Sequence, residues 1–313
     1  MVNEKGWLRP SFFRCSDDVH IVSTGGKSPV YDIRNLCIFA PRKKRLKKMA
    51  LIQSMEATGA KLFKYRGQIP VLIFVLSLPI LFFTNQNLYA NNTITDFHCP
   101  VYAICTILSV LLVVAGLALR AYTVCTTPKG TSGRNTSKQV ADHLNTKGIY
   151  SVVRHPLYLA NYLIWAGLLV YTMNIFAFVI VSLIYWIYYE RIMMAEEAFL
   201  RGKYGNEFEE WAARVPAFIP KWSLYEGGML QFSWKTFIRR EYATIMSTIF
   251  TYTIIDYILY YLIVFRNAGE CSGYCVNWIR PSLYILIAYT IIALLIKLIK
   301  HKTTWLDATP DRD

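Results

Sequence analysis

Long apolar runs separated by polar, charged stretches dominate the chain after residue 50. A run of about 20 apolar residues is the length at which a helix crosses the hydrocarbon core of a bilayer. The pattern therefore predicts an all-α, polytopic helical membrane protein with about six transmembrane helices. The apolar segments cover residues 68–83, 101–119, the two halves of 157–189, 242–265 and 281–299.

The apolar stretch from Leu157 to Tyr189 is too long for a single span. As one helix it would reach about 50 Å at about 1.5 Å per residue, whereas the hydrocarbon core is about 30 Å thick. A polar interruption lies near its middle, at 172–174. The stretch is therefore expected to fold as a short helical hairpin that turns at this interruption.

The distribution of basic residues predicts the orientation. Loops 84–100 and 172–174 contain no Lys or Arg, whereas loops 120–154 and 190–241 are rich in both. Basic residues concentrate in cytoplasmic loops, so both termini are expected in the cytoplasm of a bacterial inner membrane or an ER-like membrane. The net charge of +14 is explained in this way and by anionic lipid headgroups, and nucleic acid is not expected as a partner.

Residues 1–48 are polar and end in the basic run PRKKRLKK. Two interpretations stay open: a headgroup-binding tail, or a segment ahead of a later start at Met49 or Met55. The seven cysteines show no zinc-ligand spacing with histidines, so no metal site is expected. Cys271 and Cys275 lie in a predicted outer loop, where either a disulfide or two free thiols is consistent with the sequence.

The first group of candidate functional residues stands at the start of the hairpin, in GIYSVVRHPLY. Pro156 suits the first turn of a helix, which places Arg154 and His155 at the water boundary. A helix N-terminus beside an arginine can bind an anion. The alternatives are an Arg154 that only reaches for headgroups and a His155 that is a satisfied boundary residue.

The second group follows the hairpin, in EEAFLRGKYGNEFEEWAARVPAFIP. Glu196 and Glu197 begin an amphipathic stretch that would lie in the headgroup layer, and Gly202 and Gly205 make a helix break possible. Arg214 is a candidate partner for Glu197 or for an acidic substrate. Asp256, within the fifth apolar segment, is expected to line the bundle interior, bonded to a Tyr or Ser.

The order RHPxY, paired Glu, KYGxxFxxW and RVPxFIP resembles the isoprenylcysteine carboxyl methyltransferase and phospholipid methyltransferase superfamily over residues 101–221. The resemblance implies an S-adenosylmethionine pocket between the hairpin and the cytosolic amphipathic segment, and a lipid or lipidated acceptor that enters from the bilayer. It also implies three regions: a basic N-terminal tail (1–55), a membrane methyltransferase core (56–221) and a C-terminal extension with two further spans (222–313).

The resemblance also implies roles for individual residues. The cofactor-binding residues would be Val153, Arg154, His155, Tyr158, Glu196 and Glu197. The catalytic residues would be Glu197, Arg214 and His155, with Arg214 positioning the acceptor. Phe208 and Trp211 stand where tyrosines are common in the family, so two hydroxyls that could bind the cofactor are absent.

Two other classes of function were weighed against a methyltransferase. Membrane sterol or steroid reductases have a related C-terminal pattern and bind NADPH, but EEAFLRG fits their pattern less well. A transporter or lipid-binding scaffold would need polar groups at mid-span, where the sequence offers only Asp256. The sequence therefore favours an integral-membrane, S-adenosylmethionine-dependent methyltransferase.

Overall fold

The computed structural model describes residues 51–90, 100–128, 141–228, 230–267 and 279–307. The chain divides into two units, Met1–Lys48 and Met49–Asp313, and the described residues all belong to the second. The expectations for the N-terminal tail at 1–48 and for Cys271 and Cys275 fall outside the described residues.

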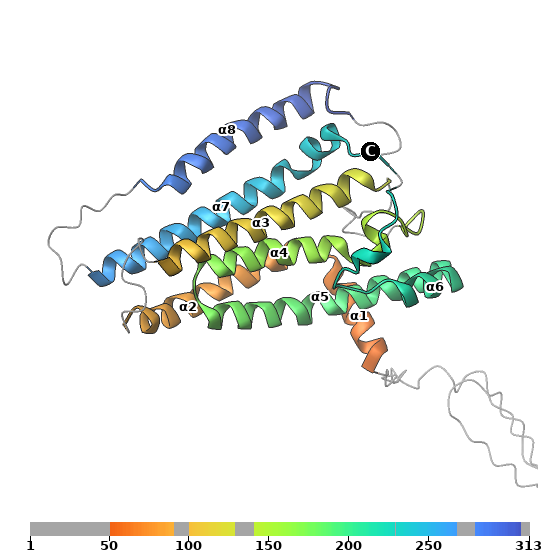
Figure 1. Ribbon diagram of the computed structural model, residues 1–313, viewed down its shortest axis with the longest axis horizontal. Coiled ribbons are helices and arrows are strands. Elements are labelled where there is room, and N and C mark those ends of the chain that lie inside the picture. Colours follow the sequence, from red (N-terminus) through yellow and green to blue (C-terminus); the bar gives the residue numbers. More distant parts are fainter. Residues whose placement is uncertain (1–50, 91–99, 129–140, 229, 268–278, 308–313) are drawn as a thin grey trace, which may run out of the picture. The chain divides into compact units, whose positions relative to one another are not determined.

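The described secondary structure is helical, and the predicted all-α class is confirmed (Figure 1). The elements, in chain order, are α1 (Leu51–Phe63), α2 (Ile69–Ala90), α3 (Pro100–Thr126), η2 (Ile149–Ser151), α4 (Pro156–Tyr171), α5 (Ile175–Tyr204), α6 (Asn206–Arg214), η3 (Trp222–Leu224), α7 (Trp234–Asn267) and α8 (Pro281–Lys302).

All six predicted apolar segments form helices. Among the described residues, α3, α5, α7 and α8 contain stretches long and apolar enough to cross a membrane, and α2 and α4 contain shorter apolar stretches. Large apolar side chains such as Leu111 on α3 and Leu295 on α8 are more than half exposed. Such a continuous apolar surface is unfavourable in water and is expected for helices that face lipid.

The predicted hairpin is confirmed. Helix α4 ends at Tyr171, and α5 begins after Asn174, whose side chain accepts a hydrogen bond from the backbone N–H of Ala177 at 2.9 Å. An Asn at this position satisfies one of the donors that a helix N-terminus leaves unpaired. The polar interruption therefore ends one helix and starts the next.

Small residues allow the helices around the hairpin to approach closely. A Cβ added to Gly116 on α3 would lie 2.7 Å from the carbonyl oxygen of Ala160 on α4, and one added to Gly167 would lie 2.7 Å from that of Ser109. Helix α1 packs on α5 through Gly59 in the same way, against the carbonyl of Arg191. Close backbone approach at small residues is a common means of packing helices in membranes.

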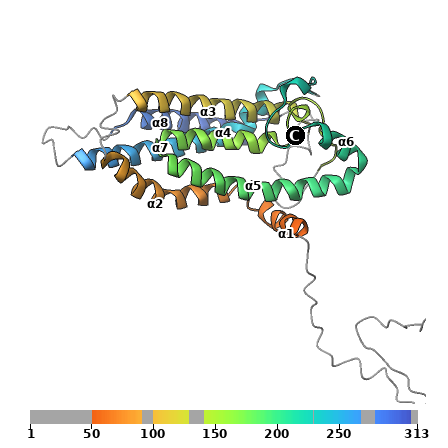
Figure 2. The ribbon, with the colours of Figure 1, turned by 60° about the horizontal axis from the view of Figure 1, so that its bottom comes forward.

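Of the two C-terminal helices, α7 packs on the hairpin and α8 packs on α7 (Figure 1 and Figure 2). Helix α7 contacts both α3 and α4, and α8 contacts α7. Asp256 on α7 lies inside this bundle, where it accepts hydrogen bonds from Tyr171 at 2.7 Å and Ser282 at 2.6 Å, as expected, and also from Arg280 at 3.0 Å. These three donors satisfy the carboxylate, so Asp256 stabilises the packing of α4, α7 and α8.

Candidate functional site

Main-chain hydrogen bonds hold Arg154 and His155 in position, independently of their side-chain contacts. Their N–H groups donate to the carbonyls of Pro216 and Ala217 at 2.9 and 3.1 Å, and the N–H of Lys221 donates to the carbonyl of Val152 at 2.9 Å. The segment that follows α6 therefore runs beside the start of α4. Main-chain hydrogen bonds thus join two motifs that are about sixty residues apart in the sequence.

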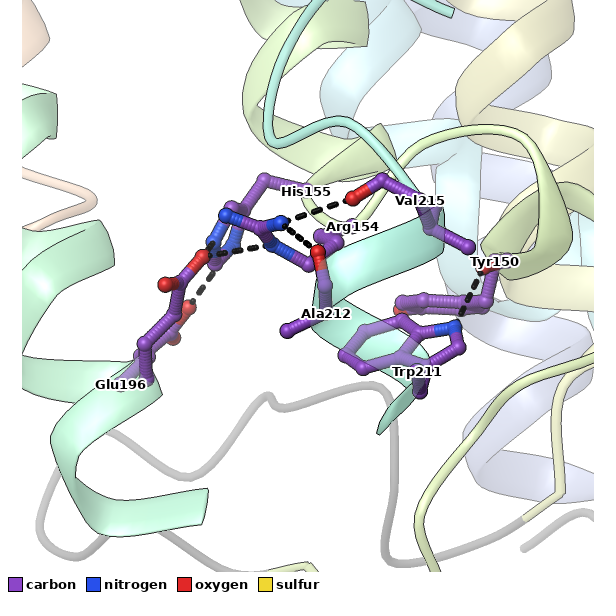
Figure 3. Close-up of polar contacts among 8 residues, drawn as sticks. Tyr150, Arg154, His155, Glu196, Trp211, Ala212 and Val215 are labelled. Carbon is purple, nitrogen blue, oxygen red and sulfur yellow. Dashed lines mark hydrogen bonds and ion pairs between the residues drawn. The ribbon is translucent and has the colours of Figure 1, made fainter. Parts of the chain in front are cut away.

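The chain changes direction at Gly205, and this turn brings α6 and the segment after it back to the start of α4. Gly205 adopts φ +54°, a left-handed conformation that favours glycine, and it separates α5 from α6, whereas Gly202 stays helical. Helix α6 then buries Phe208 and Trp211. The indole N–H of Trp211 donates to the carbonyl of Tyr150 at 3.1 Å (Figure 3), so this residue anchors α6 to the segment before α4.

The guanidinium of Arg154 joins α5 to the C-terminal end of α6. Its Nε donates to Oε1 of Glu197 at 2.8 Å, and its Nη1 donates to the carbonyls of Ala212 and Val215, both at 2.7 Å (Figure 3). The last carbonyls of a helix lack intrahelical donors, and a cation there is favourable. Arg154 therefore orients Glu197 and caps α6 with one planar group.

His155 lies between the two glutamates. Its Nε2 is 2.9 Å from Oε1 of Glu197 and its Nδ1 is 3.6 Å from Oε2 of Glu196. The imidazole stacks on the ring of Tyr158, whose hydroxyl donates to Oε1 of Glu196 at 2.7 Å. Burial by itself would lower the pKa of His155, but the hydrogen bonds and charges of the two carboxylates outweigh it and raise the pKa above its ordinary value.

Arg66, which the sequence reasoning missed, also contributes a cation. It lies between α1 and α2, its Nη1 is 3.8 Å from Oε1 of Glu196, and its guanidinium lies 4.0 Å from the ring centre of Phe63. The only signal in the sequence is its position in KYRGQ, just ahead of the first apolar run. Nothing in that segment indicates a glutamate partner so distant in the chain.

These side chains line a cavity of about 280 Å³. Its wall is built from residues of α1, α3, α4, α5 and α6 and from the loops before α2 and α4. The lining residues are Phe63, Arg66, Gly67, Arg120, Ala141, His143, Leu144, Asn145, Tyr150, Arg154, His155, Pro156, Leu157, Tyr158, Asn161, Tyr189, Glu196, Glu197, Phe199, Leu200 and Trp211.

A second charged group in this wall was not predicted either. Arg120, at the end of the second apolar segment, donates through Nε to Oε2 of Glu241 at 2.7 Å and through Nη1 to Oδ1 of Asn161 at 2.9 Å. The sequence shows Arg120 only as the first basic residue after a span. Its partner Glu241 is on α7, far away in the sequence.

Five of the seven predicted site residues meet in this cavity: Arg154, His155, Tyr158, Glu196 and Glu197. Val153 is fully buried in an apolar cluster with Ile149 and Val152 and does not line the cavity. Arg214 is exposed, and its Nε lies 3.4 Å from the carbonyl of Glu210, also away from the cavity. The roles of Val153 in cofactor binding and of Arg214 in catalysis stay predictions.

The arrangement suits a cationic ligand beside an anionic one. Two carboxylates held by a histidine and two arginines form a fixed field, and aromatic rings such as Tyr150, Tyr158 and Trp211 offer faces to an apolar or cationic group. One buried acceptor in the wall, Oδ1 of Asn145, has no hydrogen-bond partner among the described residues. Buried acceptors are rarely left unpaired, so this oxygen is placed for a ligand donor.

Comparison with known proteins agrees with the resemblance seen in the sequence. Residues 104–207 match the model of the phospholipid methyltransferase family. This segment is therefore similar to that family. It contains the hairpin, both glutamates and the RHP motif, which are the parts that build most of the cavity.

Curated relatives match over similar stretches. The protein-S-isoprenylcysteine O-methyltransferase of Schizosaccharomyces pombe is 37% identical over 86 residues, covering 27% of this chain and 36% of the relative. A probable protein-S-isoprenylcysteine O-methyltransferase of Oryza sativa subsp. indica is 32% identical over 117 residues, covering 35% and 58%. The cobalt-zinc-cadmium resistance protein CzcN of Cupriavidus metallidurans is 39% identical over 84 residues, covering 27% and 38%.

The chain thus spans less than two thirds of the length of each of these relatives. No solved structure matches the chain. The family model covers residues 104–207, so helices α1, α2, α7 and α8 lie outside it.

Proposed function

We propose that the protein is an integral-membrane, S-adenosylmethionine-dependent methyltransferase that acts on a lipid or lipidated acceptor. The observation that carries the proposal is the cluster of His155, Glu196 and Glu197 on the wall of a cavity, within a segment that matches the phospholipid methyltransferase family. Interacting titratable groups in a cavity are the usual mark of an active site.

The residues of the cavity fit S-adenosylmethionine. The carboxylates of Glu196 and Glu197 favour a positive charge, which a sulfonium and an α-ammonium both carry. The aromatic rings suit an adenine, and the unpaired Oδ1 of Asn145 can accept from an adenine amino group or a ribose hydroxyl. When bound, S-adenosylmethionine supplies an electrophilic methyl group on its sulfonium sulfur.

The chain's own residues would do the remaining work by positioning and electrostatics. Glu197 is held from two sides, by His155 at 2.9 Å and by Arg154 at 2.8 Å, so its charge is fixed in direction. With the cofactor bound, these residues would hold the acceptor beside it; the cofactor would supply the methyl group, and its sulfur would keep the electron pair of the bond that breaks. A carboxylate or phosphate acceptor needs no base, whereas an amine would lose a proton, for which His155 or a glutamate would serve.

The membrane context supports a lipid-borne acceptor. The cavity lies among apolar helices, so a prenyl or acyl tail can stay in the bilayer while its polar head reaches the carboxylates. The protein-S-isoprenylcysteine O-methyltransferases among the relatives support a prenylated acceptor in particular. The Lys- and Arg-rich loops on both sides of the hairpin support a cytoplasmic position for the cavity.

Two measurements test the proposal. Calorimetry on purified protein in detergent should detect S-adenosylhomocysteine binding in the wild type and in the surface variant Glu209→Gln, but not in Glu197→Gln. Binding of NADPH in place of S-adenosylhomocysteine would favour the reductase class instead.

Incubation of native membranes with methyl-tritiated S-adenosylmethionine, followed by separation of labelled lipid from labelled protein, identifies the acceptor class. Label in neither fraction, beside label in a control membrane methyltransferase, would contradict the proposal.

A further inference from the structure

Helix α7 contacts a cavity-lining residue although it lies outside the family segment. Glu241 is only 2% exposed, and its Oε2 accepts from Nε of Arg120 at 2.7 Å. Arg120 comes from α3, inside the family segment, and lines the cavity. Helix α7 is therefore connected to the site through this ion pair.

The hydrogen bonds of Arg120 determine which part of its guanidinium can meet a ligand. Nε is bound by Glu241 and Nη1 by Oδ1 of Asn161 at 2.9 Å. Among the described residues no acceptor takes the N–H groups of Nη2. A guanidinium has five donors in a fixed plane. Hydrogen bonds at Nε and Nη1 therefore fix that plane and leave the N–H groups of Nη2 in a defined direction.

Arg120 forms its hydrogen bonds with Glu241 and Asn161 and not with Glu196 or Glu197. Those carboxylates are bound by Arg154, His155 and Arg66, whereas Arg120 has its own acidic partner on α7. The wall of the cavity thus holds two distinct charged clusters. The first favours a cation, and the second presents guanidinium donors.

We propose that Arg120 binds an anionic group in this cavity, a carboxylate or a phosphate, and that Glu241 is its positioning residue. The proposal rests on the proposed methyltransferase function. The anion has two possible sources with the same chemistry: the α-carboxylate of the cofactor, or the acidic head of the acceptor. Either way, helix α7 takes part in the recognition of ligand by a family segment that it does not belong to.

The experiment compares two ligands that differ in their charged groups. S-adenosylhomocysteine has an α-carboxylate, and 5′-methylthioadenosine keeps the nucleoside and thioether without it. Calorimetric affinities for both are measured in the wild type, Arg120→Gln, Glu241→Ala and Glu241→Gln. Asp256→Asn serves as the matched control, because it removes another buried carboxylate of α7 that pairs with an arginine but does not line the cavity.

If the cofactor is the source of the anion, Arg120→Gln should weaken S-adenosylhomocysteine about tenfold or more and 5′-methylthioadenosine less than about twofold. If the acceptor supplies the anion, Arg120→Gln should keep its affinity for both S-adenosylhomocysteine and 5′-methylthioadenosine. Methyl transfer to native membranes at saturating cofactor should then fall about tenfold or more. Glu241→Ala should repeat the same pattern with a smaller loss, and Glu241→Gln, which keeps an acceptor for Nε, should lose least.

Equal weakening of both ligands in Arg120→Gln would show that the ion pair only supports the fold, and would overturn the proposal. So would unchanged affinities together with unchanged transfer. A Glu241→Ala variant that behaves like wild type, beside an impaired Arg120→Gln, would remove the positioning role. Failure of the wild type to bind S-adenosylhomocysteine would instead contradict the proposed function itself.

Discussion

Replacing Arg154 by lysine tests whether this residue mainly holds the site together. Lysine keeps the charge, but one ammonium cannot replace a planar group that bonds Glu197, Ala212 and Val215 at once. A hydrogen bond to a charged group contributes about 1.5–3 kcal/mol. Loss of one or two of the three bonds therefore predicts a destabilisation of about 2–4 kcal/mol, below a simple sum because neighbouring contacts are not additive.

The measurement is the midpoint of thermal unfolding, followed by tryptophan fluorescence in detergent. At about 2–4 °C per kcal/mol for a domain of roughly 150–250 residues, Arg154→Lys should lower the midpoint by roughly 5–15 °C. Arg201→Lys is the control, because Arg201 also pairs with a glutamate, Glu209, but both side chains are about half exposed. Such a pair contributes about 0–1 kcal/mol, so the control should shift the midpoint little.

Equal midpoints for the two lysine variants would refute the reasoning. An unchanged midpoint for Arg154→Lys together with lost S-adenosylhomocysteine affinity would show that the guanidinium binds ligand rather than α6.

Three further predictions concern Gly167, His155 and Arg214. Gly167→Val should destabilise the protein by about 1–3 kcal/mol or more, because its side chain would meet the carbonyl of Ser109; a thermal midpoint equal to wild type would contradict the close packing of α3 on α4. The pKa of His155 is raised in the folded protein, so protonated His155 stabilises the ligand-free protein fully below about pH 6.5 and less as the pH rises through the raised value. The thermal midpoint of unfolding should therefore fall over that range of pH. The variant His155→Gln should remove this pH dependence. Arg214→Gln should leave S-adenosylhomocysteine affinity within about twofold, since Arg214 is exposed outside the cavity; a large loss in calorimetry would place it in the cofactor site.

Local chemistry in the sequence was enough to predict much of the fold. Apolar runs of spanning length predict helices because backbone groups in lipid must bond within their own segment. The turn of the hairpin was predictable for a similar reason, since Thr172 and Asn174 interrupt an otherwise apolar stretch. The break at Gly205 was only a possibility, because the sequence does not show which of two glycines leaves the helix.

Long-range pairing was beyond the sequence. Arg280 is a basic residue in the loop 266–280, which the sequence predicts to be on the outer side, where basic residues are not expected. In the structure it binds Asp256 within the bundle. Glu241 and Arg120 are far apart in the chain, and neither carries a local sign of its partner. Such pairs depend on which helix faces meet, and that is decided by the packing of the whole bundle.

The backbone bonds between Val152–His155 and Pro216–Lys221 have a consequence for changing the protein's specificity. They use only peptide groups, which every residue except a donor-lacking proline retains. Cavity-facing side chains such as Leu200 or Phe199 can therefore be varied in a library without loosening the strand-like pairing that joins the two motifs. For the proposed methyltransferase, changes at a few such positions should alter the acceptor range while the register between the two motifs is preserved.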